Sequence, residues 1–211
     1  MARSGFTKNR MYTDLTAAAL LQNGGAILPQ DAGDVLLPLA RAAIGAQLGT
    51  ILAAPDEADW LSMTGASFVT LLLQSELRGC IGTLEAHRAL GEDVKANAVA
   101  AAFRDPRFKP LEKQEFDSLS VEISVLSATE AVAFRDENDA LAQLRPDIDG
   151  VIIEYGHHRS TFLPQVWENF PDPRVFLGHL KYKAGLPPDF WDPAVKLSRY
   201  TVSKWREAKI G

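Results

Sequence analysis

The chain has 211 residues, of which 46% are hydrophobic and 23% are charged, and its formal net charge is −5. These fractions are typical of globular proteins and exclude a disordered, collagen-like or coiled-coil chain. A chain of this length forms one or two domains and buries enough surface to need no disulfide or metal for its core. Its one cysteine excludes an intramolecular disulfide, and the negative charge argues against a nucleic acid phosphate backbone as the main partner.

We do not expect the basic residues near the N-terminus to begin a signal peptide. The apolar run that follows them, 17–21, has only five residues, whereas a signal peptide needs about 7–15. The longest uncharged stretches, 15–30 and 60–75, contain polar residues and are shorter than the roughly 18 apolar residues of a membrane span. We therefore expect a cytoplasmic protein without membrane association, and we interpret residues 1–14 as a loose N-terminal arm.

The first regular elements follow from hydrophobic periodicity. Apolar positions at helical spacing predict a helix over 35–48, capped by Asp34 and ended by Gly49. The continuous apolar run 68–73 predicts a strand that is buried on both faces. Residues 78–84 predict a second strand, which two glycines interrupt.

Strands and helices then alternate irregularly. Three further helices are predicted at 93–103, 137–145 and 173–184. Four further strands are predicted at 119–125, 151–155, 159–163 and 195–202. The second and third of these strands form a hairpin with a loop of about three residues, and the last lies at a sheet edge. Because regular βαβ alternation is missing, we predict an α+β fold of mixed or antiparallel sheets with flanking helices.

The most unusual segment is Leu-Arg-Gly-Cys-Ile-Gly-Thr at 77–83. Gly79 and Gly82, three residues apart in a strand, indicate a bulge or a close approach of other backbone. Cys80 lies between them, and the guanidinium of Arg78 is suited to stabilise a thiolate or to bind an anion. The segment is either an anion-binding loop with a reactive cysteine or a small buried cysteine beside turn glycines. The seven residues alone favour the second interpretation.

The four histidines do not supply an obvious base for this cysteine. His87 follows Cys80 by seven residues, and His179 lies on a predicted helix. His157 and His158 lie in the predicted hairpin loop, where exposure to solvent is expected. Their spacing matches no zinc site. We therefore expect no metal and no cofactor, and we assign no role to His157 and His158.

Three further segments carry candidate site residues. Asp105, in Asp-Pro-Arg-Phe, pairs with Arg107 or Arg78, and such a pair locks a loop at least as readily as it binds a ligand. Glu122, on the polar face of its strand, is either a general base or substrate anchor in a cleft, or a carboxylate facing water or an arginine. We expect an arginine from the 78 or 107 segment beside it. The segment 161–167 is better explained as core followed by a helix start.

These segments, in this order, resemble the AMMECR-type domain, which in bacteria and archaea is called AmmeMemoRadiSam system protein A. The matching pieces are Leu-Arg-Gly-Cys-Ile-Gly-Thr at 77–83, Asp-Pro-Arg-Phe at 105–108 with Pro-Leu at 110–111, Val-Glu-Ile-Ser-Val-Leu at 121–126, Gly-Val-Ile-Ile-Glu at 150–154, Thr-Phe-Leu-Pro-Gln-Val-Trp at 161–167 and Lys-Ala-Gly-Leu-Pro-Pro at 183–188. The resemblance covers about residues 15–200. The segment 156–160, Gly-His-His-Arg-Ser, departs from the glycine- and arginine-rich turn of the family.

The resemblance implies one domain over 15–211, with two unequal lobes around a cleft lined by the Arg-Gly-Cys-Ile-Gly loop. It also implies a MEMO-type protein and a radical SAM protein as partners, but no established reaction. We therefore predict a component of a radical-SAM-linked modification system that binds a small or peptidic anionic ligand. If a reaction occurs, Cys80 is the nucleophile, Arg78 the charge stabiliser and Glu122 the proton acceptor. The predicted ligand-binding residues are Gly79, Ile81, Gly82, Thr83, Asp105, Arg107 and Phe108.

Two other functions remain open. The first is a non-catalytic adaptor that docks the same partner proteins. The second is binding of single-stranded RNA, because 79–82 fits the Gly-x-x-Gly of KH domains and 196–211 holds five basic residues against one acidic residue. A KH loop joins two helices, however, whereas this segment lies among predicted strands. The net charge is also negative, so RNA binding is the least favoured of the three.

Overall fold

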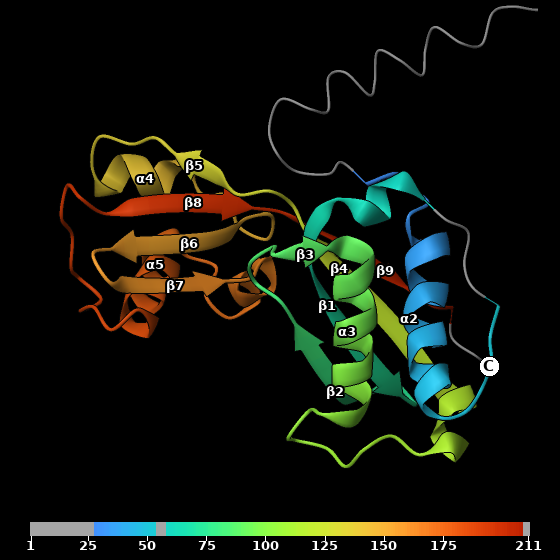
Figure 1. The fold of residues 1–211 in the computed structure, drawn as a ribbon. Coiled ribbons are helices and arrows are strands. Elements are labelled where there is room, and N and C mark those ends of the chain that lie inside the picture. The colour runs from blue at the N-terminus through green and yellow to red at the C-terminus, as the bar shows by residue number, and fades with distance from the viewer. Residues whose placement is uncertain (1–27, 54–57, 209–211) are drawn as a thin grey trace, which may run out of the picture.

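The computed structural model describes residues 28–53 and 58–208, so the expected arm at 1–14 lies outside the described residues. The described chain forms two lobes, each with one antiparallel sheet and its own buried core (Figure 1). The first lobe comprises 28–126 and 202–208, apart from the gap, and the second comprises 130–200. The predicted α+β class with two lobes is confirmed.

The first lobe contains a sheet with the strand order β2-β1-β4-β9, and short strand β3 pairs with the start of β1. Its elements are α2 (Gly33–Gln47), η1 (Asp59–Ser62), β1 (Thr64–Leu73), β2 (Glu76–Gly82), β3 (Arg88–Ala89), α3 (Leu90–Phe103), η2 (Lys113–Ser118), β4 (Leu119–Leu126) and β9 (Val202–Arg206). Helices α2 and α3 lie side by side on one face of this sheet (Figure 1). The other face carries the residues of the cleft described below.

Burial along the central strands shows this two-sided arrangement. In β4 the alternating apolar residues from Leu119 to Val125 are buried and the residues between them are half-buried, which confirms the predicted alternation. The prediction that 68–73 is buried on both faces was wrong. Val69 and Leu71 are fully buried against the helices, whereas Phe68, Thr70 and Leu72 on the opposite face remain half-exposed. A continuous run of apolar residues therefore does not show that both faces of this strand are buried, because only the face toward the helices is packed.

The second lobe contains a sheet with the strand order β5-β8-β6-β7. Its elements are β5 (Glu130–Val132), α4 (Glu137–Gln143), β6 (Gly150–Tyr155), β7 (His158–Phe162), η3 (Pro164–Glu168), α5 (Pro173–Lys183) and β8 (Lys196–Tyr200). Trp167 is fully buried, and its ring stacks on Phe176 with 3.6 Å between centroids. Its indole N–H donates to the carbonyl of Asp149 at 2.7 Å. This supports the interpretation of 161–167 as core followed by a helix start.

The two lobes are joined where the chain crosses between them twice. The outgoing crossing follows β4 and the returning crossing lies between β8 and β9 (Figure 1). The crossings bind each other, because Ser127 N–H donates to Thr201 O and Thr201 N–H donates to Ser127 Oγ, both at 2.9 Å. An ion pair between Glu85 and Arg159 also connects the lobes. The second lobe is thus one continuous insertion between two neighbouring strands of the first.

Three predicted details of the elements were wrong. Helix α2 is preceded by Ala32 at the cap position, and Asp34 lies inside its first turn without capping it. The hairpin loop has two residues, Gly156 and His157, because Tyr155 already pairs with His158. The expected edge strand 195–202 is divided at Thr201 into β8, which lies inside the second sheet, and β9, which is an edge of the first. Among the described residues, no helix is both long and apolar enough to cross a membrane.

Candidate functional site

Strand β2 divides the predicted loop residues between two faces. Gly79, Ile81 and Thr83 face the helices, since Ile81 packs against the core and Thr83 Oγ1 donates to buried Asp93 at 2.8 Å. Cys80 faces the opposite side and lines the cleft between the lobes. A bulge precedes Gly79, because Leu71 pairs with Gly79 but the next residue, Leu72, pairs with Leu77. The bulge was one of the two outcomes predicted from the glycines.

Gly79 also shows the second predicted outcome, a close approach of other backbone, whereas the close neighbour of Gly82 is a side chain. A Cβ on Gly79 would lie 2.2 Å from the backbone oxygen of Ala101 in α3. A Cβ on Gly82 would lie 2.2 Å from the ring of Phe68 on the cleft face. Gly79 therefore allows helix α3 to pack directly on β2, and Gly82 makes room for an aromatic ring beside Cys80.

Asp105 and Arg107 close the outer edge of β2 at Cys80. The backbone N–H of Cys80 donates to Asp105 Oδ2 at 2.8 Å, and Arg107 Nη2 donates to the carbonyl of Cys80 at 3.2 Å. The two side chains also form a two-pronged pair, with Nε–Oδ1 at 2.9 Å and Nη2–Oδ2 at 2.7 Å. They occupy the position that a neighbouring strand would take. The predicted loop-locking pair is therefore present, and it holds the backbone of the cysteine.

Electrostatics at this pair favour the ionised carboxylate. The guanidinium of Arg107 holds the pKa of Asp105 well below its usual range, with further help from the N–H groups of Cys80 and Arg107 that donate to it. The side chain of Asp105 is only 1% exposed, whereas that of Arg107 is 53% exposed. The Nε–Nη2 edge of the Arg107 guanidinium is therefore bound to Asp105, and the rest of the guanidinium is exposed to the cleft.

A row of polar side chains crosses the open face of the sheet. Cys80 pairs with Thr70, and Thr70 pairs with Glu122 on its other side. Thr70 Oγ1 lies 3.3 Å from Cys80 Sγ, and Glu122 Oε1 lies 3.3 Å from Lys204 Nζ on β9. The expected arginine beside Glu122 is replaced by Lys204, because β9 and not the 78 or 107 segment borders β4. Glu122 and the cysteine nevertheless share one face, as the alternation predicted.

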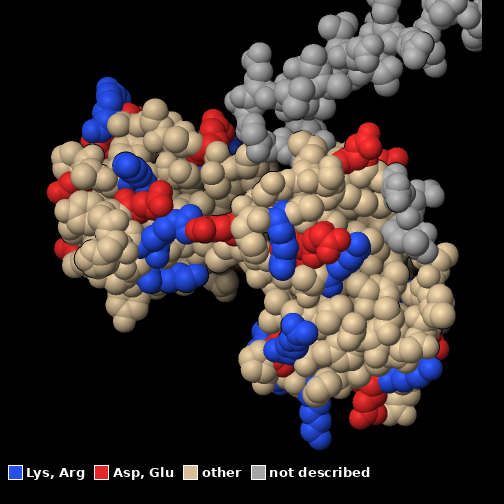
Figure 2. All heavy atoms as spheres, viewed as in Figure 1, with Lys and Arg blue, Asp and Glu red and all other residues tan. Residues whose placement is uncertain are grey.

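These residues line a cleft of about 530 Å³ between the lobes, and Figure 2 shows the notch that separates the lobes on one side. The first lobe contributes Phe68, Thr70, Leu77, Cys80, Arg107, Glu122, Ser124, Val202 and Lys204. The second lobe contributes the start and the end of η3 through Leu163, Gln165, Glu168 and Asn169. Sequence reasoning missed Thr70, Lys204 and Gln165. Only Thr70 had a signal, since strand alternation places it beside Cys80 once the pairing of β1 with β2 is known.

Arg78 lies away from the cleft. Its Nε and Nη2 donate to the two carboxylate oxygens of Glu115 at 2.8 and 3.0 Å, and this pair raises the pKa of Arg78 and lowers that of Glu115. Its guanidinium also lies 6.0 Å from the centre of the Phe108 ring, which in turn lies 5.5 Å from the guanidinium of Arg107. Because Arg78 is the extra residue of the bulge, the strand period does not fix its direction. Arg107, and not Arg78, is the arginine that contacts Cys80, through the carbonyl of that residue.

Comparison with known proteins agrees with this fold. The sequence model of the AMMECR1 family matches residues 37–205. The chain belongs to the AMMECR1 family. A protein of Methanothermobacter thermautotrophicus is 37% identical over 185 residues, which is 85% of this chain and 96% of that protein. Protein MJ0810 of Methanocaldococcus jannaschii is 40% identical over 136 residues, 64% of this chain and 68% of that protein.

A solved member of the AMMECR1 fold gives the same result in three dimensions. The crystal structure of the uncharacterized protein PH0010 from Pyrococcus horikoshii superposes with a TM-score of 0.70 at 34% sequence identity. The match covers 86% of this chain and 94% of that chain. The resemblance drawn from the six ordered motifs is thus confirmed, including the α+β architecture.

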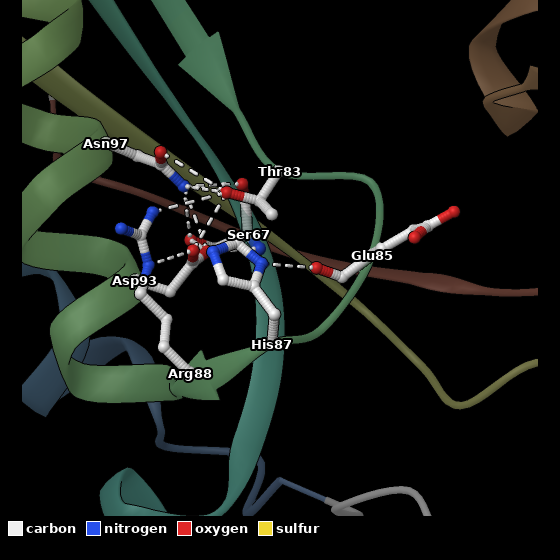
Figure 3. A network of polar contacts seen from close by, with 7 residues as sticks. All are labelled: Ser67, Thr83, Glu85, His87, Arg88, Asp93 and Asn97. Carbon is white, nitrogen blue, oxygen red and sulfur yellow. Dashed lines mark hydrogen bonds and ion pairs between the residues drawn. The ribbon is translucent and has the colours of Figure 1, made fainter.

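The face of the AMMECR1 sheet that packs on α3 holds a buried polar network (Figure 3). Asp93 is fully buried and accepts hydrogen bonds from Ser67, Thr83, Arg88 and Asn97. This network ties the end of β2 to α3 and fixes the start of the loop that carries Glu85. Thr83 was predicted to bind a ligand, but its hydroxyl is used here, on the opposite side of the sheet from Cys80.

The histidines and the Gly-x-x-Gly segment have other roles in this AMMECR1 chain. His158 is half-buried, and its Nδ1 donates to the carbonyl of Ala184 at 2.9 Å, while His157 is exposed. Within the described ranges, no three His, Cys, Asp or Glu side chains are placed to hold a metal ion. Residues 79–82 lie inside strand β2 and do not join two helices. The geometry therefore differs from the RNA-binding loop of a KH domain.

Proposed function

We propose that the chain binds a small or peptidic anionic ligand in the cleft between its lobes, as a component of a radical-SAM-linked modification system. The observation that supports the site is the convergence of the Cys80 thiol, the Arg107 guanidinium and the Lys204 ammonium group on one cleft. Partnership with a MEMO-type protein and a radical SAM protein rests on the family resemblance.

The cationic groups are arranged to meet a carboxylate or a phosphate. Arg107 uses Nε and Nη2 for Asp105, and its Nη1 has no protein partner in the described part of the chain. Lys204 is 51% exposed and touches Glu122 at 3.3 Å, so its ammonium group can turn toward a ligand. A planar guanidinium with a free edge binds an oxyanion with directional hydrogen bonds. The opposite wall offers the side chains of Gln165 and Asn169 as further hydrogen-bonding groups.

The same row of residues is suited to thiol chemistry if a reaction takes place. Thr70 Oγ1 donates toward Cys80 Sγ at 3.3 Å, and the guanidinium of Arg107 contacts the backbone carbonyl of the same cysteine. Glu122, released from Lys204 by an anionic ligand, would serve as the proton acceptor on the same sheet face. The alternative is a non-catalytic adaptor in which the cleft or the lobe surfaces dock the partner proteins and the thiol is dispensable.

Protection of Cys80 from alkylation tests the site. We expect iodoacetamide to modify Cys80 in the native protein, and we expect members of a library of short peptides with free C-terminal carboxylates to slow this reaction. Arg107→Gln should weaken that protection at least ten-fold, whereas Arg104→Gln, a change at an exposed arginine outside the cleft, should not. Alkylation only after unfolding would contradict the proposed site. Unchanged capture of the partner proteins by Cys80→Ser would favour the adaptor.

A further inference from the structure

The edge strands of the two sheets differ in how far their outward backbone groups are covered. A free edge strand offers unpaired N–H and C=O groups to any extended chain that reaches it. In the first lobe, the β2 edge is closed at Cys80 by Asp105 and Arg107. In the second lobe, β5 is only three residues long. Neither of these edges offers a run of free backbone groups.

The β7 edge is covered by the end of helix α5. Ser160 Oγ donates to the carbonyl of Leu180 at 2.7 Å, and His158 Nδ1 donates to that of Ala184 at 2.9 Å. Lys183 Nζ in turn donates to the carbonyl of Thr161 at 2.9 Å. The end of α5 therefore lies against β7, and Lys183 occupies the Thr161 carbonyl, one of the backbone groups of this edge.

Strand β9 has no such cover within the described residues. Ser127 N–H donates to Thr201 O, and Glu207 N–H donates to Val121 O at 3.0 Å, so the odd-numbered residues of this segment direct their backbone groups toward β4. Backbone direction alternates along a strand. The N–H and C=O groups of Val202, Lys204 and Arg206 therefore point away from the sheet, and they have no partner among the residues that the structure describes.

The side chains beside this edge define what would fit there. Lys204 and Arg206 lie on the cleft face, and the exposed Arg206 has no ion-pair partner in the described ranges. Trp205 lies on the helix face, where its ring packs against Gly33. A groove of about 420 Å³ runs beside the start of the strand and is lined by Asp147, Ile148, Pro164, Gln165, Glu168, Thr201, Val202 and Lys204. Ile148 is 50% exposed in this groove and offers an apolar contact.

We propose that β9 is a docking edge for an extended segment of a partner polypeptide, which adds to the sheet as a further strand. Residues directly opposite each other on paired strands share a face. Acidic side chains of the segment would lie opposite Lys204 and Arg206, and an apolar side chain would lie opposite Trp205. Lys204 belongs both to β9 and to the Cys80 cleft. This inference depends on the outward backbone groups of β9, whereas the proposed function depends on the side chains of the cleft, so one can fail while the other succeeds.

Hydrogen exchange measured by NMR on the full chain gives the first test. In the free protein we expect fast exchange at the amides of Val202, Lys204 and Arg206 and slow exchange at those of Ser203 and Trp205. The probe is the peptide acetyl-(Glu-Val)₃-amide. Two control peptides have the same sequence: in one every valine is N-methylated, and in the other every glutamate is N-methylated. Saturation with the probe should slow the three outward amides at least ten-fold. Slow exchange at all five amides before peptide is added would show that the edge is already occupied, and would overturn the proposal.

Two variants at one position separate backbone from side-chain binding. Arg206→Pro removes the outward N–H at a position outside the Cys80 cleft, and proline is tolerated where a strand N–H faces solvent. Arg206→Ala removes the same side chain but keeps the N–H. We expect the proline variant to bind the probe at least ten-fold more weakly than the alanine variant, with equal melting temperatures and unchanged Cys80 alkylation. If the proline variant has a lower melting temperature than the alanine variant, only the comparison of N-methylated and unmethylated peptides tests the proposal. The proposal would be overturned if both N-methylated peptides bound the protein as tightly as the probe, or if both variants bound the probe equally at equal stability.

Discussion

A single backbone oxygen explains why position 79 is glycine. The carbonyl of Ala101 occupies the space that a Cβ would need, at 2.2 Å, and a helix carbonyl cannot move without displacing α3. We expect Gly79→Ala to lower the free energy of unfolding by about 1–3 kcal/mol, in the range of other overpacked sites. Gly82→Ala should cost less, because it meets the ring of Phe68, which can rotate.

Urea unfolding of both variants checks this order. Gly91→Ala in α3 is the matched control, since its Cβ would meet Leu61 at an ordinary 3.4 Å. Alanine favours a helix over glycine by about 1 kcal/mol, so this control should be neutral or stabilising. If Gly79→Ala were as stable as the parent, the close packing of α3 on β2 would be excluded.

The carboxylate of Asp105 makes stability depend on pH in the acid range. Arg107 holds the pKa of Asp105 well below its usual range in the folded protein, whereas in the unfolded chain aspartate takes up a proton near about pH 4. The unfolded state therefore binds the proton first as pH falls. The stability contributed by Asp105 is complete above about pH 4 and is lost progressively below it.

Asp105→Asn should therefore differ most from the parent near neutral pH. We expect the parent to have the higher urea midpoint at about pH 6, and the gap should narrow steadily toward about pH 2.5. Asp189→Asn, a change at an exposed aspartate, should leave the midpoint close to that of the parent at both pH values. A gap that widened on acidification would contradict the assigned charge state.

Among elements, the junction of β2 with α3 depends on Asp93. Its carboxylate is fully buried and accepts from Arg88 Nε at 2.8 Å as well as from Ser67, Thr83 and Asn97. Asp93→Ala leaves all these donors without their acceptor, and breaking a buried ion pair costs about 3–5 kcal/mol. We expect the variant to unfold at a correspondingly lower urea concentration.

The neighbouring residue supplies the control for that change. Glu92 pairs with Lys95 on the exposed side of α3, and its side chain is 66% exposed. Surface ion pairs contribute about 0–1 kcal/mol, so Glu92→Ala should unfold almost like the parent. A similar loss of stability in both variants would show that helix charge, and not the buried network, is responsible.

The elements also show where sequence reasoning succeeds. Alternation in β4 predicted its buried face and placed Glu122 on the opposite, polar face, because a strand has only two faces. The structure shows that this polar face lines the cleft. Periodicity predicted a helix over 173–184, and α5 spans Pro173–Lys183 with its apolar face buried. The sequence left Arg107 and Arg78 as alternative partners of Asp105, and the structure shows the pair with Arg107, which is separated from Asp105 by one proline.

Long-range pairing set the limits of that reasoning. Lys204 is 82 residues from Glu122 in the chain, and only the pairing of β4 with β9 brings them together. The division at Thr201 has no signal in the alternation of the run 195–202, because only the pairing of β8 with β6 and of β9 with β4 shows that the chain changes sheet there. The prediction that Arg78 lies in the cleft was wrong, because simple alternation does not give the side-chain direction of a residue in a bulge. Which residues line the cleft therefore depends on long-range strand pairing and cannot be derived from local sequence patterns.

At the scale of the whole molecule, the two lobes have separate cores. Leu36 is fully buried in the first core and Leu177 in the second. Truncating such a leucine to alanine costs about 2–5 kcal/mol. Because the apolar clusters are distinct, we expect Leu177→Ala to speed amide exchange in 130–200 far more than in the first lobe, and Leu36→Ala to do the reverse.

Hydrogen exchange resolved by mass spectrometry of peptic fragments measures both variants. Cooperative opening units often coincide with compact substructures. Equal acceleration across both lobes in either variant would show that the lobes open as a single unit, held together by the Ser127–Thr201 crossing and the pair of Glu85 with Arg159.

The insertion of the second lobe between β4 and β9 has a consequence for protein synthesis. A ribosome makes β4 and then the whole of 130–200 before it makes β9. Domains fold as units while the chain emerges. The second lobe can therefore be complete while the nascent first sheet still ends at β4, with the backbone groups that later meet β9 exposed. The delay between these two strands is set by the length of the inserted lobe, so a chaperone that shields extended nascent segments would act during this interval.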